Sequence, residues 1–142
     1  MSYYIGFRFK GIVKPEFRKD FTEIALHAKW ADSSDERFRT FGEGSYARAY
    51  PNGKALVDSW ETDPEFHTQY NEITGLWAFR TCFNFNGGGA AYDWESWEEL
   101  LPYFMESIEL YEIMWEDSDG TQLRGLVENT DKEFGKYIEV LK

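Results

Sequence analysis

The chain has 142 residues, a formal net charge of −11 at pH 7 and an aromatic content of 19%. This length predicts one globular domain spanning residues 1–142, and so many aromatic residues exclude a disordered acidic chain. The acidic balance excludes nucleic-acid binding through a basic footprint, because phosphate contacts need clustered Lys and Arg. With Cys82 as its one cysteine, the chain has neither an intramolecular disulfide nor a cysteine-based zinc site.

The first half of the chain predicts a strand followed by helical segments. Residues 3–13 alternate between apolar and polar side chains, as expected for a half-buried strand. Pro15 suits the start of a helix, and the apolar spacing from Phe17 to Ala28 predicts an amphipathic helix that ends near Trp30. Residues 32–35 form a plausible cap for a short helix through Phe41. The Asn-Gly pair at 52–53 then predicts a hairpin that joins residues 45–50 to 54–60.

The second half repeats the order of strand and helix. A loop at 61–75, with one helical turn near 64–70, leads to a strand at 76–85 whose aromatic residues face one side. Gly87–Gly89 ends this strand. A second amphipathic helix should begin at Asp93 or Glu95 and reach Ile108, with a kink or a late start at Pro102. Residues 110–116 read as a strand, Asp119-Gly120 as a turn and 121–128 as a further strand, whereas 134–141 fit either a strand or a helix.

This order of elements favours an α+β fold. Two strand–helix–strand halves predict an antiparallel sheet with two helices packed on one face. The closest architecture is ferredoxin-like, a split βαβ arrangement, with a C-terminal β-hairpin added. No apolar run reaches the roughly 20 residues that span a bilayer. The N-terminus also lacks the features of a signal peptide, so we expect a cytoplasmic protein with no membrane partner.

The charge is unevenly distributed along the chain. Residues 72–142 contain five Lys or Arg against fifteen Asp or Glu, whereas residues 1–71 contain ten against eleven. Between Thr81 and Leu123 there are ten carboxylates and no basic residue. Apolar residues are threaded through this stretch, so it should fold and present one charge sign. Such a surface repels nucleic acid and attracts basic proteins, although an acidic surface that only maintains solubility is an equally good interpretation.

Motifs for catalysis and metal binding are weak. Gly87–Gly89 lacks the spacing of a nucleotide-binding loop, and Asp117–Gly120 fits a tight turn better than a calcium loop. The carboxylates Glu95, Glu98 and Glu99 suit a solvated helix start. His27 and His67 lie far apart in the sequence, and no serine or cysteine elbow accompanies them. We therefore predict no catalytic residues, no metal ligands and no cofactor.

The leading hypothesis is a non-enzymatic acidic module that docks on a basic protein, such as a toxin or a nucleic-acid-binding protein. Inhibitors, immunity proteins and counter-defence proteins have this size and charge. Trp94 and Tyr103 lie off the apolar stripe of the second helix and are the predicted anchors, because exposed aromatic residues among carboxylates favour binding to Lys and Arg. The predicted charged contacts are Glu95, Glu98, Glu99, Glu106, Glu112, Glu116 and Asp119.

The alternative is a small-molecule-binding α+β domain with an aromatic pocket between the sheet and the helices. Its predicted lining is aromatic: Trp77, Phe79, Trp97, Tyr111 and Trp115. Arg80 or Arg48 would hold an anionic group of the ligand. The sequence leaves the partner, the source organism and the oligomeric state open.

Overall fold

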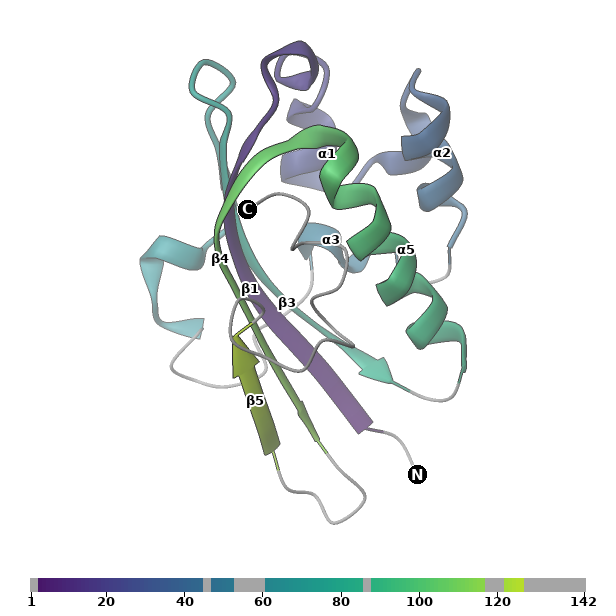
Figure 1. Cartoon of the computed structure of the whole chain (residues 1–142), viewed down its shortest axis with the longest axis vertical. Coiled ribbons are helices and arrows are strands. Elements are labelled where there is room, and N and C mark those ends of the chain that lie inside the picture. Colours follow the sequence, from purple (N-terminus) through teal and green to yellow (C-terminus); the bar gives the residue numbers. More distant parts are fainter. Residues whose placement is uncertain (1–2, 45–46, 53–60, 86–87, 117–121, 127–142) are drawn as a thin grey trace.

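The chain folds around one antiparallel sheet (Figure 1). The structure is a computed structural model that describes residues 3–44, 47–52, 61–85, 88–116 and 122–126. The strands are β1 (Tyr3–Val13), β2 (Gln69–Tyr70), β3 (Leu76–Phe85), β4 (Met105–Glu116) and β5 (Gln122–Leu126). Their order across the sheet is β2-β3-β1-β4-β5, and each neighbouring pair is antiparallel. The α+β class and the antiparallel sheet are therefore confirmed.

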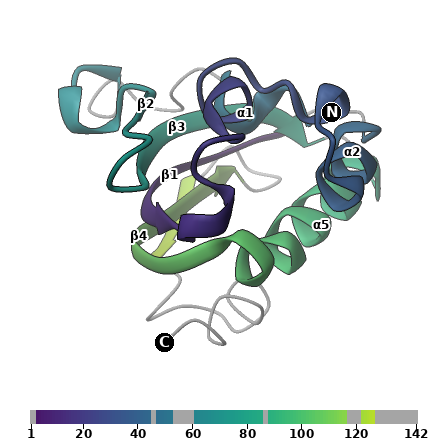
Figure 2. The same cartoon turned by 90° about the horizontal axis from the view of Figure 1, so that it is seen from above.

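The helices of the described residues lie in two parts of the chain. Between β1 and β2 lie the α-helices α1 (Thr22–His27), α2 (Glu36–Gly42) and α3 (Ala49–Asn52). The same region contains the short 3-10 helices η1 (Pro15–Phe17), η2 (Trp30–Asp32) and η3 (Pro64–Phe66). The long helix α5 (Gly88–Phe104) joins β3 to β4. Figure 2 shows α1, α2 and α5 together on one side of the sheet, away from the segment that precedes β2. More than two helices thus cover this face.

The central strand β1 divides the molecule into an apolar side and a charged side. Phe7, Phe9 and Val13 are fully buried on the helix side. Arg8 and Lys10 alternate with them and therefore point to the outer face of the sheet. The register continues this division, because Phe9 pairs with Phe79 of β3 and Tyr111 of β4, whereas Arg8 pairs with Arg80 and Glu112. The charged side chains of three strands thus form one row.

Two helices differ in extent from the sequence-based expectation. The predicted helix from Phe17 to Ala28 is divided into η1 and α1, and α1 ends where Ala28 adopts a left-handed conformation with φ of 55°. The second helix begins at Gly88 and ends at Phe104, so it starts and stops earlier than predicted. The residue after it, Met105, is fully buried and pairs with Val13, and this pairing starts β4 five residues before the expected strand.

The hairpin predicted for residues 45–60 is wrong in the part that the structure describes. Residues 49–52 form the short helix α3 where the first hairpin strand and the start of its turn were expected. Tertiary contacts outweigh the local turn signal here: Tyr50 is fully buried, and its carbonyl oxygen accepts a hydrogen bond from Trp30 Nε1 at 2.7 Å. The Thr81 hydroxyl donates to the carbonyl oxygen of Ala49 and ties α3 to β3. Residues 53–60 lie outside the described residues.

Other predicted elements are confirmed. Strand β3 covers the predicted residues 76–85, and η3 is the predicted helical turn. Helix α2 begins at the predicted cap, where Asp35 Oδ1 accepts hydrogen bonds from the amides of Arg37 and Phe38. Strand β5 pairs with β4, but the turn predicted at Asp119-Gly120 and the segment 134–141 lie outside the described residues.

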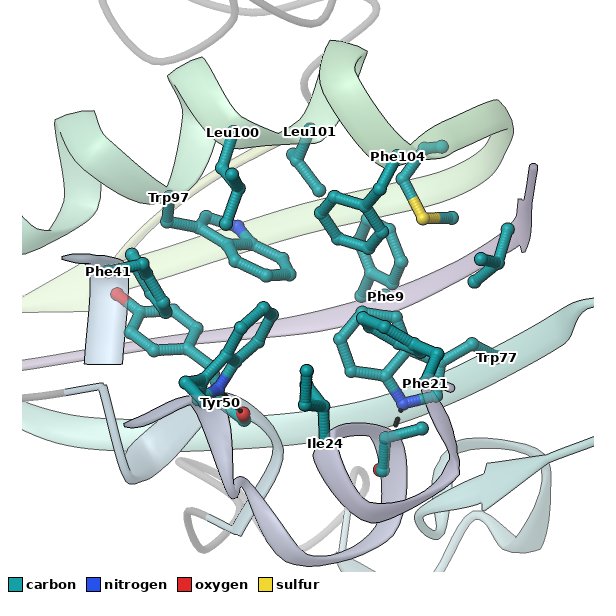
Figure 3. Close-up of a cluster of buried hydrophobic side chains, with 14 of the residues drawn as sticks. Phe9, Phe21, Ile24, Phe41, Tyr50, Trp77, Trp97, Leu100, Leu101 and Phe104 are labelled. Carbon is teal, nitrogen blue, oxygen red and sulfur yellow. Dashed lines mark hydrogen bonds between the residues drawn. The ribbon is translucent and has the colours of Figure 1, made fainter. Parts of the chain in front are cut away.

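Aromatic side chains fill the space between the helices and the sheet (Figure 3). Phe21 lies over Trp77 with ring centroids 4.9 Å apart, and Trp97 stacks on Tyr50 at the same separation. The indole Nε1 of Trp77 donates to the carbonyl oxygen of Ala25 at 3.1 Å, which fixes α1 on β3. Each large aromatic side chain buries about 150–250 Å², so this layer accounts for most of the apolar stabilisation.

Candidate functional site

Helix α5 carries five of the predicted partner-binding residues, and those whose side chains are described differ in exposure. The backbones of Trp94 and Glu95 belong to α5, but their side chains lie outside the described part. Glu98 is buried, with 2% of its surface exposed. Glu99 is exposed, and Tyr103 is half-buried. The small exposed surface of Glu98 gives no support to the expectation that it offers its charge to a partner, and that role stays a prediction.

The predicted partner-binding residues beyond α5 also differ in exposure. Glu112 is only 3% exposed, and its Oε1 accepts a hydrogen bond from Arg8 Nε at 2.9 Å. A carboxylate buried against an arginine in this way favours a structural role, so the geometry does not support a partner contact by Glu112, and that role stays a prediction. Glu106 is exposed at the start of β4. The side chain of Glu116 and the whole of Asp119 lie outside the described residues, so their binding roles stay predictions.

Basic residues from the first eighteen positions form ion pairs with the β4 carboxylates whose side chains the structure describes. Arg8 pairs with Glu112, Lys10 Nζ lies 3.8 Å from Glu109 Oε2, and Arg18 Nη2 lies 3.6 Å from Glu106 Oε2. The antiparallel pairing of β1 and β4 brings these distant segments together. Among the described side chains, the acidic stretch is therefore not a surface of one charge sign, which corrects that part of the sequence-based expectation. Glu99 takes part in none of the ion pairs found among the described residues.

Tyr103 is held by a network that sequence reasoning missed. Its hydroxyl donates a hydrogen bond to Asp35 Oδ2 at 2.7 Å, while the other oxygen of that carboxylate caps α2. This hydrogen bond, followed by burial and the negative charge of Asp35, raises the pKa of the Tyr103 phenol, and Arg37 opposes the shift. The guanidinium of Arg37 lies over the Tyr103 ring, 4.5 Å from its centroid. Tyr103 is thus pre-oriented, with one ring face covered by a cation.

The same ring touches η1. The rings of Phe17 and Tyr103 lie 5.0 Å apart, and Phe17 is also partly exposed. Glu99 lies one helical turn before Tyr103 on the same side of α5, and the Arg18–Glu106 pair follows directly after Phe17. We call this group the α5-end patch; its residues are Phe17, Arg37, Glu99, Tyr103 and Glu106. Phe17 and Arg37 come from parts of the chain more than sixty residues away, and no sequence signal linked them to Tyr103.

The aromatic residues proposed to line a ligand pocket form the packed core instead. Trp77, Phe79, Trp97 and Tyr111 are at most 3% exposed. Ring centroids of Trp77 and Phe79 lie 4.6 Å apart, and those of Phe79 and Trp97 5.9 Å apart. The side chain of Trp115 lies outside the described residues.

Neither candidate arginine reaches this group of aromatic residues. Arg80 alternates with Phe79 along β3 and therefore lies on the opposite face of the sheet, where its Nη2 is 3.5 Å from Glu61 Oε1. Arg48 is exposed in the turn before α3. The geometry of the described residues gives the pocket hypothesis no support.

The described residues offer neither a metal site nor a membrane-spanning helix. In that part of the chain, no three His, Cys, Asp or Glu side chains come close enough together to hold a metal ion. None of its helices combines the length and the apolar character needed to cross a bilayer. The candidate calcium loop at Asp117–Gly120 lies outside the described residues.

The sequence matches no known family model, no curated protein and no solved structure. Any functional proposal for this chain therefore rests on its own residues, and the α5-end patch is where most of the predicted docking residues with described, accessible side chains lie together.

Proposed function

We propose that this protein is a non-enzymatic binding module that docks on a basic protein surface through the α5-end patch. The observation that carries the proposal is the pair of half-buried rings, Phe17 and Tyr103, 5.0 Å apart and flanked by the exposed carboxylates of Glu99 and Glu106. Binding hot spots typically have an aromatic centre in a polar rim, and Tyr and Arg are among the residues most enriched in them.

Pre-organisation supports this choice of surface. The Tyr103 ring is fixed by Asp35, Arg37 and Phe17, so little side-chain entropy remains to be lost when a partner covers it. Phe38 packs against the ring from below, with centroids 5.8 Å apart, and links the patch to the core. A rigid aromatic anchor of this kind is suited to binding a complementary surface.

The charge of the chain favours a basic partner. The net charge of −11 creates a long-range field that attracts cations during diffusional encounter. Within the patch, Glu106 is already paired with Arg18, whereas Glu99 has no such partner among the described side chains. Glu99 is therefore the carboxylate of the patch that is best placed to form a new ion pair with a Lys or Arg.

We extend the proposal to the finer architecture and to the class of partner. The strand order β2-β3-β1-β4, with a helix between β3 and β4, supports the ferredoxin-like description. The antiparallel pairing of β4 with β5 supports the C-terminal hairpin. Small acidic modules that neutralise a basic toxin or a nucleic-acid-binding protein, as inhibitors, immunity proteins or counter-defence proteins do, form the functional class that we propose, acting in the cytoplasm.

Affinity capture from the native host tests the proposal. Tagged wild-type protein should retain a basic protein that the double variant Glu99→Lys/Glu106→Lys fails to retain. The matched control is Glu16→Lys/Glu72→Lys, which reverses two exposed carboxylates outside the patch. Capture by the control and not by the patch variant supports the proposal. Equal capture by all three proteins, or capture of acidic proteins only, contradicts it.

A further inference from the structure

A second surface with a defined charge pattern lies on the outer face of the sheet, away from the helices. Arg8 of β1 and Arg80 of β3 are direct cross-strand partners, and Lys10 follows Arg8 on the same face. These three cations, which we call the cationic strip, lie side by side in a protein that is otherwise strongly acidic. Their side chains are only 16–25% exposed, so another segment covers them in part.

The covering segment is the stretch 61–66, which precedes β2 and includes η3. Its three acids alternate along the chain, and each meets one cation of the strip. Glu61 lies 3.5 Å from Arg80, Asp63 lies 3.5 Å from Arg8, and Glu65 lies 2.7 Å from Lys10. We call this segment the acidic strap.

The strap ends in an aromatic anchor. Phe66 is 4% exposed, and the Arg8 guanidinium lies over its ring at 4.8 Å. The exposed imidazole of His67 bonds to the carbonyl oxygen of Glu61 at 2.9 Å and closes the strap into a loop. The complete recognition pattern on the strip is thus three alternating carboxylates followed by a buried aromatic ring.

The strap fits the strip imperfectly. Two of its three ion pairs are 3.5 Å long, beyond the length of a good charge-assisted hydrogen bond. Arg80 Nε is buried and has no hydrogen-bond acceptor among the described residues. Ion pairs this accessible each contribute little to stability. A ligand that places a carboxylate against both nitrogens of Arg80 would satisfy this donor, which the strap leaves without an acceptor.

We propose that the cationic strip is a binding surface for an acidic peptide segment that carries an aromatic residue, and that the strap occupies it in cis as an autoinhibitory contact. With the strap in place, the carboxylates on this face outnumber the cations. Removing the strap leaves three cations, Arg8, Lys10 and Arg80, with the β4 carboxylates Glu109 and Glu112, so the net charge of the uncovered group becomes positive. An external segment gains access only in the fraction of molecules whose strap is open, and its apparent affinity falls by that fraction.

The chemistry of the acidic strap indicates what kind of peptide the cationic strip can bind. The strip accepts alternating carboxylates because its three cations are neighbours on the sheet face and each already meets one acid of the strap. It accepts an aromatic ring beside them through Arg8. This surface lies on the opposite side of the sheet from α5, so the proposal is independent of docking through the α5-end patch.

A peptide with the sequence of residues 61–67, fluorescently labelled, tests this inference by anisotropy. The opened variant is Glu61→Gln/Asp63→Asn/Glu65→Gln, in which the side-chain amide introduced in place of Asp63 can still cap η3. It should bind the peptide at least about tenfold more tightly than wild type, because the cis competitor has lost its charge. The charge-matched control, Glu16→Gln/Glu43→Gln/Glu72→Gln, removes three exposed acids elsewhere and should bind like wild type.

Two further measurements locate the binding. Adding Lys10→Gln/Arg80→Gln to the opened variant should abolish the gain, and a peptide with its acids replaced by amides should not bind. Phe66→Ala opens the strap without changing its charges and should also increase binding, which provides a second route if the triple variant is unstable. Equal affinity of the opened and control proteins, or binding that persists when the strip is neutralised, overturns the proposal.

Discussion

Glu112 should stabilise the fold through its ion pair with Arg8. Substituting each partner in turn tests this structural role. Arg8→Met keeps most of the length of the side chain and removes its charge. The carboxylate of Glu112, 3% exposed, then loses the guanidinium that lies 2.9 Å away. Glu112→Leu removes the other partner, but Arg8 is 20% exposed and still lies near Asp63 and water. The two substitutions are therefore expected to differ in cost.

The burial of each group sets the magnitudes. Leaving a buried charge without its partner typically costs about 3–5 kcal/mol, and we expect Arg8→Met to lower the free energy of unfolding by about 3 kcal/mol because Glu112 has further contacts. Glu112→Leu should cost about 1–2 kcal/mol, since the remaining cation can be solvated. The double variant should recover much of the loss, because an apolar pair replaces a buried ion pair at little cost.

Urea denaturation measures these differences as shifts in midpoint at constant m-value. The internal control is Lys29→Met, which breaks the pair of Lys29 with Glu23 at 3.9 Å, where the side chains are 53% and 65% exposed. That variant should lose at most about 1 kcal/mol. If Arg8→Met costs no more than Lys29→Met, or if the double variant is as unstable as Arg8→Met, Glu112 is not a sealed structural carboxylate and the reasoning fails.

Two further predictions concern the turn between β2 and β3 and the residues around it. Burial, with a smaller effect of the Glu72 charge, raises the pKa of Tyr70 to about 12, and its hydroxyl donates to the carbonyl oxygen of Arg18. Because the folded pKa of Tyr70 exceeds the unfolded value of about 10, the contribution of its protonated phenol to stability is complete below pH 10 and is lost as the pH rises toward 12. Urea titrations at increasing pH should therefore show a fall in the free energy of unfolding of wild type and a smaller fall for Tyr70→Phe. Equal falls in the two proteins would contradict the raised pKa. Gly75 has φ of +80°, and a Cβ there would lie 2.6 Å from the carbonyl oxygen of Val13. Gly75→Ala should therefore cost about 1–3 kcal/mol, whereas an unchanged melting temperature would show that the turn relaxes freely.

Regular alternation and capping made part of the fold predictable from the sequence. The strand at 76–85 and the cap of α2 at Asp35 depend on neighbouring residues only, and both are confirmed. The helix α5 was recognised from its apolar spacing, but its end was not, because the burial of Met105 against β1 determines where β4 begins. At residues 49–52, the hydrogen bonds from Trp30 and Thr81 outweigh the turn preference of Asn-Gly.

The candidate site was predictable only in outline. The position of Tyr103 off the apolar stripe of α5 and the place of Glu99 in the acidic stretch predict accessible side chains; Glu99 is exposed and Tyr103 half-buried. The burial of Glu98 and Glu112 could not be inferred from their position in an acidic stretch; that of Glu112 depends on the pairing of β4 with β1 and on Arg8. Likewise, the partners that orient Tyr103, among them Asp35 and Arg37, come from α2 and its cap. Contacts across the fold, more than local charge, decide which carboxylates are available for binding.

The most direct test of docking through the α5-end patch is the association rate with the captured basic partner, measured for wild type and Glu99→Lys/Glu106→Lys at two ionic strengths. At low salt the variant should associate at least about tenfold more slowly, and the difference should shrink as salt screens the field. Circular dichroism should show the same fold in both proteins. Equal rates at low salt, or an equal slowing by Glu16→Lys/Glu72→Lys, would contradict docking at this patch.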